Sequence, residues 1–267
     1  MAIRLNDLRK TRSVLPPRVL IYGPPGLGKT SLGTEWPNPV LFDIEGGRPA
    51  NVPIEKVPGF DADQIGSYDA VMEALGSLYT DDHDFQTLVF DTLDRFEPYI
   101  WQKTCEDNNW ASIEAPGYGK GYVGADKYWR DFLEGLNALR RDRNMTIILI
   151  AHSDITRFDD PQAASYSRFD IRLHKRALAM VQDEVDAVLF VNQDTTIKQE
   201  DLGFNKKRAR AEGGTTRLIY AEGRPAFVAK NRYGIPASMR YDIGQGYAAL
   251  SQYLPGTVAP ATEKEAA

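Results

Sequence analysis

The sequence has few of the residues that mark disulfide-stabilised, metal-clustered or membrane-spanning proteins. Its single cysteine, Cys105, excludes an internal disulfide framework, and its three histidines form no ligand group at zinc spacing. The most apolar run, Ile147 to Ala151, is far shorter than the ~20 residues that span a bilayer. The first twenty residues contain no apolar stretch of signal-peptide length. Together these features predict a protein of the reducing cytoplasm.

The chain also lacks an excess of positive charge. It carries 32 Lys plus Arg against 37 Asp plus Glu, a formal net charge of -5. This excludes a wholly basic nucleic-acid binder, although a local basic patch remains open. With 42% hydrophobic residues and no internal repeat, we expect one core over residues 18–254. An N-terminal segment, 1–17, precedes it, and a disordered tail, 255–267, follows it.

Short apolar runs that stop at turn or polar residues predict strands buried on both faces. Five such runs are Arg18 to Tyr22, Val40 to Asp43, Thr87 to Asp91, Thr146 to Ala151 and Asp186 to Val191. Between them, apolar residues recur at helical spacing, as in the segment from Asp126 to Arg143. The alternation predicts an α/β fold with a mostly parallel sheet, helices on both faces, and ligands at the carboxyl ends of the strands.

The chain becomes more polar after Val191. Two short β-like runs, Thr216 to Tyr220 and Ala226 to Ala229, predict a C-terminal β-hairpin. The polar, Gly-containing stretch from Thr195 to Gly214 is then its long, mobile tip.

A phosphate-binding pattern, G-x-x-x-x-G-K-[ST], follows the first predicted strand. Backbone N–H groups of such a loop converge on phosphate oxygens, the lysine reaches the β and γ phosphates, and the hydroxyl ligates Mg²⁺. The alternative is a Gly/Pro turn with an exposed lysine. The residues predicted to contact ATP are Gly23, Pro24, Pro25, Gly26, Leu27, Gly28, Lys29, Thr30 and Ser31.

Carboxylates end two of the other predicted strands. Asp91 ends Thr87 to Asp91, where it would hold Mg²⁺ together with Thr30. Glu45 follows the strand Val40 to Asp43 and is the candidate for polarising the attacking water, with Asp43 as the second choice. Asp and Glu are also common where turns begin, so each carboxylate has a structural alternative.

A loop lysine, an acid after the second strand and an aspartate after the third together resemble the RecA-like ATPase core. In that core a polar residue after the next strand senses the γ-phosphate, and His152 occupies this place here, where the RecA protein itself has glutamine. The alternative for His152 is a structural role. The segment Lys230-Asn-Arg-Tyr-Gly234 resembles the K-N-R-F-G motif of RadA recombinases and the paired cations of DnaB-type helicases. That resemblance implies that Lys230 and Arg232 reach a neighbouring subunit's triphosphate; a surface charge pair is the alternative.

The stretch from Arg18 to about Gly246 resembles the phage RecA-core single-strand annealing proteins of the Sak group. This resemblance implies a DNA-stimulated ATPase that uses ATP and Mg²⁺ and binds single-stranded DNA. It also implies that the protein assembles with copies of itself as a ring or filament and acts beside a single-stranded DNA-binding protein. If a phage encodes the protein, it would lie in the host cytoplasm. Three segments combine cations with rings or form a basic run, as single-strand binding requires. They are a Gly-rich loop (Ser112 to Tyr128), a second loop (Ser153 to Arg176) and the stretch from Lys198 to Arg210. The predicted DNA contacts in them are Tyr118, Lys120, Tyr122, Arg168, Arg172, Lys206, Lys207, Arg208 and Arg210.

Other assignments stay open on the sequence. The Gly-rich loop could equally be a lid over nucleotide, and the basic run a solvated hairpin tip. For the whole chain the alternatives are a ring helicase or loader, a module that ATP assembles on DNA with negligible hydrolysis, and a small-molecule kinase.

Overall fold

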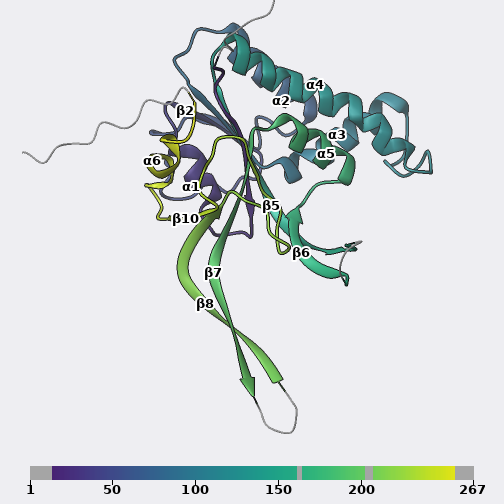
Figure 1. Ribbon diagram of the computed structural model, residues 1–267. Helices are drawn as coiled ribbons and strands as arrows, with labels where there is room; N and C mark the ends of the chain where they lie inside the picture. The colour runs from purple at the N-terminus through teal and green to yellow at the C-terminus, as the bar shows by residue number, and fades with distance from the viewer. Residues whose placement is uncertain (1–13, 161–163, 202–206, 256–267) are drawn as a thin grey trace, which may run out of the picture.

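The computed structural model describes residues 14–160, 164–201 and 207–255. Its centre is a sheet with the strand order β10-β8-β7-β1-β5-β4-β2-β3, to which β6 is added beside β5 and β9 beside β7 (Figure 1). The strands are β1 (Arg18–Gly23), β2 (Pro39–Asp43), β3 (Gly59–Asp61), β4 (Thr87–Asp91), β5 (Thr146–Phe158), β6 (Tyr166–Ile171), β7 (Ala187–Asp201), β8 (Lys207–Tyr220), β9 (Lys230–Asn231) and β10 (Ser238–Tyr241). The helices are α1 (Lys29–Thr34), α2 (Tyr68–Thr80), α3 (Leu93–Asn108), α4 (Lys120–Asp142), α5 (Lys175–Glu184) and α6 (Gly246–Ser251).

The middle of the sheet is parallel. β1 pairs in parallel with both β5 and β7, and β4 pairs in parallel with β5 and β2. The five strands predicted from apolar runs are therefore β1, β2, β4, the first half of β5 and the start of β7. Their carboxyl ends meet at one edge, which is where such sheets bind ligands.

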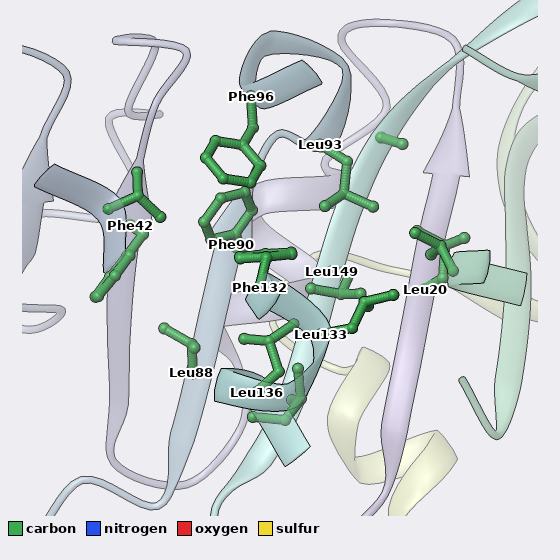
Figure 2. Packing of buried hydrophobic residues seen from close by; sticks show 14 of the residues in the cluster. Leu20, Phe42, Leu88, Phe90, Leu93, Phe96, Phe132, Leu133, Leu136 and Leu149 are labelled. Atoms are coloured by element: carbon green, nitrogen blue, oxygen red, sulfur yellow. The ribbon is translucent and has the colours of Figure 1, made fainter. Parts of the chain in front are cut away.

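Alternate residues of these strands feed two apolar cores, as the two-residue period of a strand requires. One core joins Leu20, Phe42 and Leu149 to helices α2 to α5, and Figure 2 shows Phe90 beside Phe96 and Phe132 there. The other joins the opposite face of the sheet to α1 and α6 through Leu32 and Leu250. The predicted α/β class, with a mostly parallel sheet, helices on both faces and a C-terminal hairpin, is confirmed.

The hairpin is built differently from the prediction. β7 and β8 pair from Phe190↔Tyr220 out to Asp201↔Lys207, so most of the stretch predicted as a tip is strand. The two strands extend well beyond the body of the molecule (Figure 1). The predicted run Ala226 to Ala229 is not a strand. Phe227 forms isolated bridges with Phe169 and Arg224, and the next strand is β9. The residues from Thr195 to Gly214 are mostly polar, so they lack the apolar alternation that identifies strands in a sequence.

Both predicted DNA loops are also more regular than expected. α4 begins at Lys120, so only the first part of Ser112 to Tyr128 is loop. β5 continues to Phe158 and returns as β6, and Lys175 already lies in α5. Residues 1–13 and 256–267, which contain most of the predicted N-terminal segment and tail, lie outside the described residues. Within the described part of the chain, no helix combines the length and apolarity needed to cross a membrane.

Candidate nucleotide-binding site

The predicted phosphate loop connects β1 to α1 at the carboxyl edge of the sheet. Gly26 and Gly28 adopt φ values of 76° and 82°, a left-handed conformation that glycine adopts without steric cost. A side chain at Gly28 would also lie 3.3 Å from Ile243 Cδ1. No side chain caps the start of α1. The loop therefore has the turn and the uncapped backbone that an anion-binding loop needs.

Lys29 lies buried inside this loop. Its Nζ donates a hydrogen bond to the Pro24 carbonyl oxygen over 2.9 Å. Burial lowers the pKa of the Lys29 ammonium, and the charges of Asp91 and Glu45 oppose that effect. The predicted lysine and the two predicted carboxylates are therefore close enough for their charges to interact.

Thr30 and Asp91 are in direct contact. The Thr30 hydroxyl donates to Asp91 Oδ2 over 2.5 Å, and Asp91 Oδ1 is buried without a hydrogen-bond partner. Burial raises the pKa of Asp91 to about 6, and the charges of Glu45 and Asp43 add to that rise. A hydroxyl beside a carboxylate with an unpartnered oxygen fits Mg²⁺, which takes one or two carboxylates and completes its shell with phosphate and water.

Two carboxylates at the carboxyl end of β2, those of Asp43 and Glu45, have different surroundings. Asp43 Oδ1 accepts a hydrogen bond from the Gly46 N–H over 2.8 Å and so closes the Glu45-Gly-Gly turn. The backbone N–H groups of Ile44 and Glu45 both donate to the Asp91 carbonyl oxygen. These bonds hold the Glu45 side chain, 32% exposed, next to the phosphate loop, with Oε1 3.6 Å from His152 Nε2.

His152 lies in β5 level with Gly23 of the phosphate loop. Its backbone N–H and its ring Nδ1 bind the two carboxylate oxygens of Asp94 over 2.9 and 3.0 Å. Burial favours a higher pKa for Asp94, but the hydrogen bonds from His152 outweigh it and keep that pKa below its usual value. We did not predict a role for Asp94; its only sequence signal is an acid in the first turn of a helix.

Arg172, predicted to bind DNA, lies beside this site. Its backbone N–H donates to the His152 carbonyl oxygen over 2.9 Å, and its guanidinium donates to the Ser153 carbonyl oxygen over 3.3 Å. The Arg172 charge contributes to the lowered pKa of Lys29, after burial. Arg172 thus adds a cation to the edge where the phosphate loop, Glu45 and His152 meet.

Lys230 and Arg232 are not brought to this edge. Lys230 Nζ donates to the Gln182 carbonyl oxygen over 2.5 Å, in the last turn of α5. Arg232 Nη1 lies 3.1 Å from Asp186 Oδ1, at the amino end of β7. Asp186 also binds Arg18 and Arg140. Burial favours a higher pKa for Asp186, but these guanidinium groups outweigh it and hold the pKa below its usual value.

The remaining predicted DNA contacts are dispersed. Tyr118 is fully exposed between Gly117 and Gly119, Lys120 begins α4, and Tyr122 stacks on His174 with ring centres 4.0 Å apart. Arg168 pairs with Asp170 over 2.9 Å and covers the Phe158 ring. The last group lies on the hairpin: Lys207, Arg208 and Arg210 are residues of β8, and Lys206 lies outside the described residues.

Comparisons with known proteins identify the family to which the chain belongs. A protein-family model described as an AAA domain matches residues 15–233. One matching solved structure is a crystal structure of the RadB recombinase, 14% identical, with 78% of this chain and 81% of that chain covered and a TM-score of 0.43. No curated protein matches the sequence. The family match spans β1, the phosphate loop, the Asp91 strand and the Lys230 segment, and on that basis the chain belongs to the AAA domain family.

Proposed function

We propose that the protein is a RecA-like ATPase that binds single-stranded DNA and anneals strands in phage homologous recombination. The main support is that residues predicted from four distant segments, Lys29 with Thr30, Glu45, Asp91 and His152, lie together at the carboxyl edge of the sheet. The resemblance to the Sak-group proteins supplies the annealing role and a single-stranded DNA-binding protein as partner.

The residues at this edge divide the work on ATP. Lys29 and the loop N–H groups hold the β and γ phosphates, and Thr30 with Asp91 holds Mg²⁺. When bound, Mg²⁺ neutralises charge on the phosphates. Glu45, tied to the Asp91 backbone, is placed to polarise the attacking water.

Lys230 and Arg232 act on a neighbouring subunit's ATP in this proposal. The β1 strand separates the Arg18–Asp186 end of the sheet from the phosphate loop by six residues, about 15 to 20 Å at the usual rise. Neither cation can therefore serve its own triphosphate. Arg232 can leave Asp186 without stranding a buried charge, because Arg18 and Arg140 remain bound to it.

Single-stranded DNA is proposed to contact three features. They are the exposed Tyr118 tip, the β5–β6 ribbon with Arg168, and the β7–β8 hairpin with Lys207, Arg208 and Arg210. An exposed ring offers a face for base stacking, and the cations neutralise phosphates. Arg172 lies between this ribbon and the phosphate loop, so it can link DNA contact to the nucleotide site.

The deciding experiment measures ATP turnover with and without single-stranded DNA for the native protein, Lys29→Ala and Arg232→Ala. We expect DNA to stimulate the native protein, Lys29→Ala to be inactive, and Arg232→Ala to lose ~10³-fold or more of the stimulated rate. Unchanged native turnover on adding DNA contradicts the recombination role. Unwinding of a forked duplex would identify a helicase instead.

Mixing the two inactive variants tests the arrangement across subunits. A 1:1 mixture should recover turnover, because about a quarter of its interfaces join an intact phosphate loop to an intact Arg232. A mixture of Lys29→Ala with Asp91→Asn is the matched control, since both changes damage the same half of the interface. Equal recovery in both mixtures, or in neither, argues against cations lent by a neighbour.

A further inference from the structure

The His152 ring is held between two carboxylates, and the nearer one determines which ring nitrogen carries hydrogen. Asp94 lies on the Nδ1 side at 3.0 Å, and Glu45 lies on the Nε2 side at 3.6 Å. The His152 side chain is 10% exposed and that of Asp94 is 5% exposed. An ionised carboxylate only accepts hydrogen bonds, so the contact with Asp94 requires hydrogen on Nδ1.

The position of Asp94 suits it to keep hydrogen on His152 Nδ1. It sits in the first turn of α3, and its second oxygen accepts the His152 backbone N–H, so the ring and the strand end are fixed by one side chain. The pKa of Asp94 is held below its usual value mainly by the His152 hydrogen bonds, against the effect of burial. Other charged groups at or next to this edge are Lys29, Asp43, Asp91, Glu97 and Arg172.

A neutral imidazole with hydrogen on Nδ1 presents a lone pair at Nε2. Nε2 and Glu45 Oε1 are then two acceptors that face each other at 3.6 Å. A single water molecule can donate one hydrogen to each. A γ-phosphate oxygen, which is itself an acceptor, cannot bind the neutral Nε2.

We propose that Asp94 is a positioning residue that fixes His152 with hydrogen on Nδ1, so that Nε2 and Glu45 together orient the attacking water. This rests on the proposed ATPase function. It changes the role predicted for His152 from a sensor of the γ-phosphate to an acceptor of a hydrogen bond from water. Asp94 and His152 act only on the orientation of the water, before the bond between the water oxygen and Pγ forms.

The chain contains its own references for a spectroscopic test. His83 accepts the Phe85 N–H at Nδ1 over 3.1 Å and contacts the Leu78 carbonyl oxygen through Nε2 over 2.8 Å. His174 accepts the Arg176 N–H at Nδ1. Both rings therefore carry hydrogen on Nε2, and of the three histidines His152 alone should carry it on Nδ1.

The test is ¹⁵N imidazole NMR of the full chain at about pH 8, where ordinary histidines are neutral, with His152→Gln to assign the signal. We expect one Nδ1–H pattern and two Nε2–H patterns in the native protein. Asp94→Asn keeps an oxygen for the His152 backbone N–H but offers an amide N–H to Nδ1, so His152 should switch to the Nε2–H pattern. The His152 Nε2–H group would then donate to Glu45 in place of the water.

Turnover completes the test. In Asp94→Asn we expect kcat to fall on the order of 100-fold, with the KM for ATP changed less than about threefold. Asp107→Asn is the matched control on the same helix, because Asp107 binds Tyr128 and does not contact His152.

Two results overturn the inference alone: an Nε2–H pattern for His152 in the native protein, or a switched pattern with full turnover in Asp94→Asn. A native protein that binds ATP but never hydrolyses it overturns the inference and the proposed function together. The native spectrum needs no variant, so misfolding of Asp94→Asn leaves that part of the test intact.

Discussion

At the scale of one residue, the buried carboxylate of Asp91 lowers the stability of the folded protein. Its carboxylate is 4% exposed, one oxygen has no partner, and burial raises its pKa to about 6. The folded protein therefore holds a poorly solvated charge near neutral pH, which costs free energy of folding. A bound cation would relieve that cost.

Asp91→Asn should separate the cost of the buried charge from its use in binding a cation. At about pH 7.5 we expect the nucleotide-free variant to be more stable than the native protein by up to about 3 kcal/mol, because a buried charge is removed. At about pH 4, where Asp91 is protonated in the folded protein, the two should converge. The variant should also lose the added stability that Mg²⁺ and ATP give the native protein. Thermal unfolding with and without Mg²⁺ and ATP measures both; a variant that still gains stability from Mg²⁺ contradicts the metal assignment.

At the scale of elements, Glu97 connects α3 to the start of α5. Both of its carboxylate oxygens accept the His174 N–H, at 3.0 and 3.1 Å, and His174 is the N-cap residue of α5. Burial raises the pKa of Glu97 to about 7, and the charge of Asp94 adds to the rise. The contact therefore changes charge state close to neutral pH.

The sign of the pH dependence follows from that shift. The folded pKa lies above the unfolded value, so the folded protein binds the proton more tightly and loses stability as pH rises towards 7. Glu97→Gln keeps an acceptor for His174 without the charge. We expect the decrease in unfolding free energy between about pH 5 and pH 8 to shrink by about 2 kcal/mol or more in this variant.

Urea unfolding at the two pH values measures the effect. Glu106→Gln is the matched control, since Glu106 is an exposed residue of the same helix that contacts Gln102. Identical pH dependence in the native protein and Glu97→Gln would show that Glu97 does not titrate in this range.

At the scale of the whole molecule, the proposed active site is divided between the two edges of one sheet. The phosphate loop, Glu45 and His152 lie at the carboxyl edge, whereas Lys230 and Arg232 contact α5 and Asp186 at the amino edge. A head-to-tail contact between copies would join the two halves, and contacts of that kind generate rings or filaments.

Turnover per subunit should therefore depend on protein concentration. We expect it to rise more than about tenfold from the nanomolar to the micromolar range, in step with assembly measured by sedimentation. The reason is that Arg232 acts only at an interface in the proposed arrangement. Arg232→Ala should assemble without this rise, and Arg240→Ala, a change to an exposed arginine paired with Asp242, should behave as native. A constant rate per subunit in dilute monomer contradicts the shared site.

Local signals carried most of what could be predicted from the sequence. The parallel strands were readable because strands buried on both faces need continuous apolar runs, and the Gly23 to Ser31 loop because phosphate binding needs glycines and a lysine at fixed spacing. The short edge strand β3 and the added strand β6 lacked such runs. The sequence predicts a tip where the outer part of the β7–β8 ribbon lies, because the residues there are mostly polar and show no apolar alternation.

The sequence by itself determined the α/β class, the phosphate loop and the order in which lysine, acids and histidine reach one edge of the sheet, because each depends on residues close together in the chain. Only the tertiary structure decided how side chains from distant segments pair. Asp94 lies 58 residues from His152 in the chain, and Arg172 reaches the nucleotide site through the antiparallel return of β6 along β5. Such pairings depend on strand register and helix packing, which no local pattern of residues encodes.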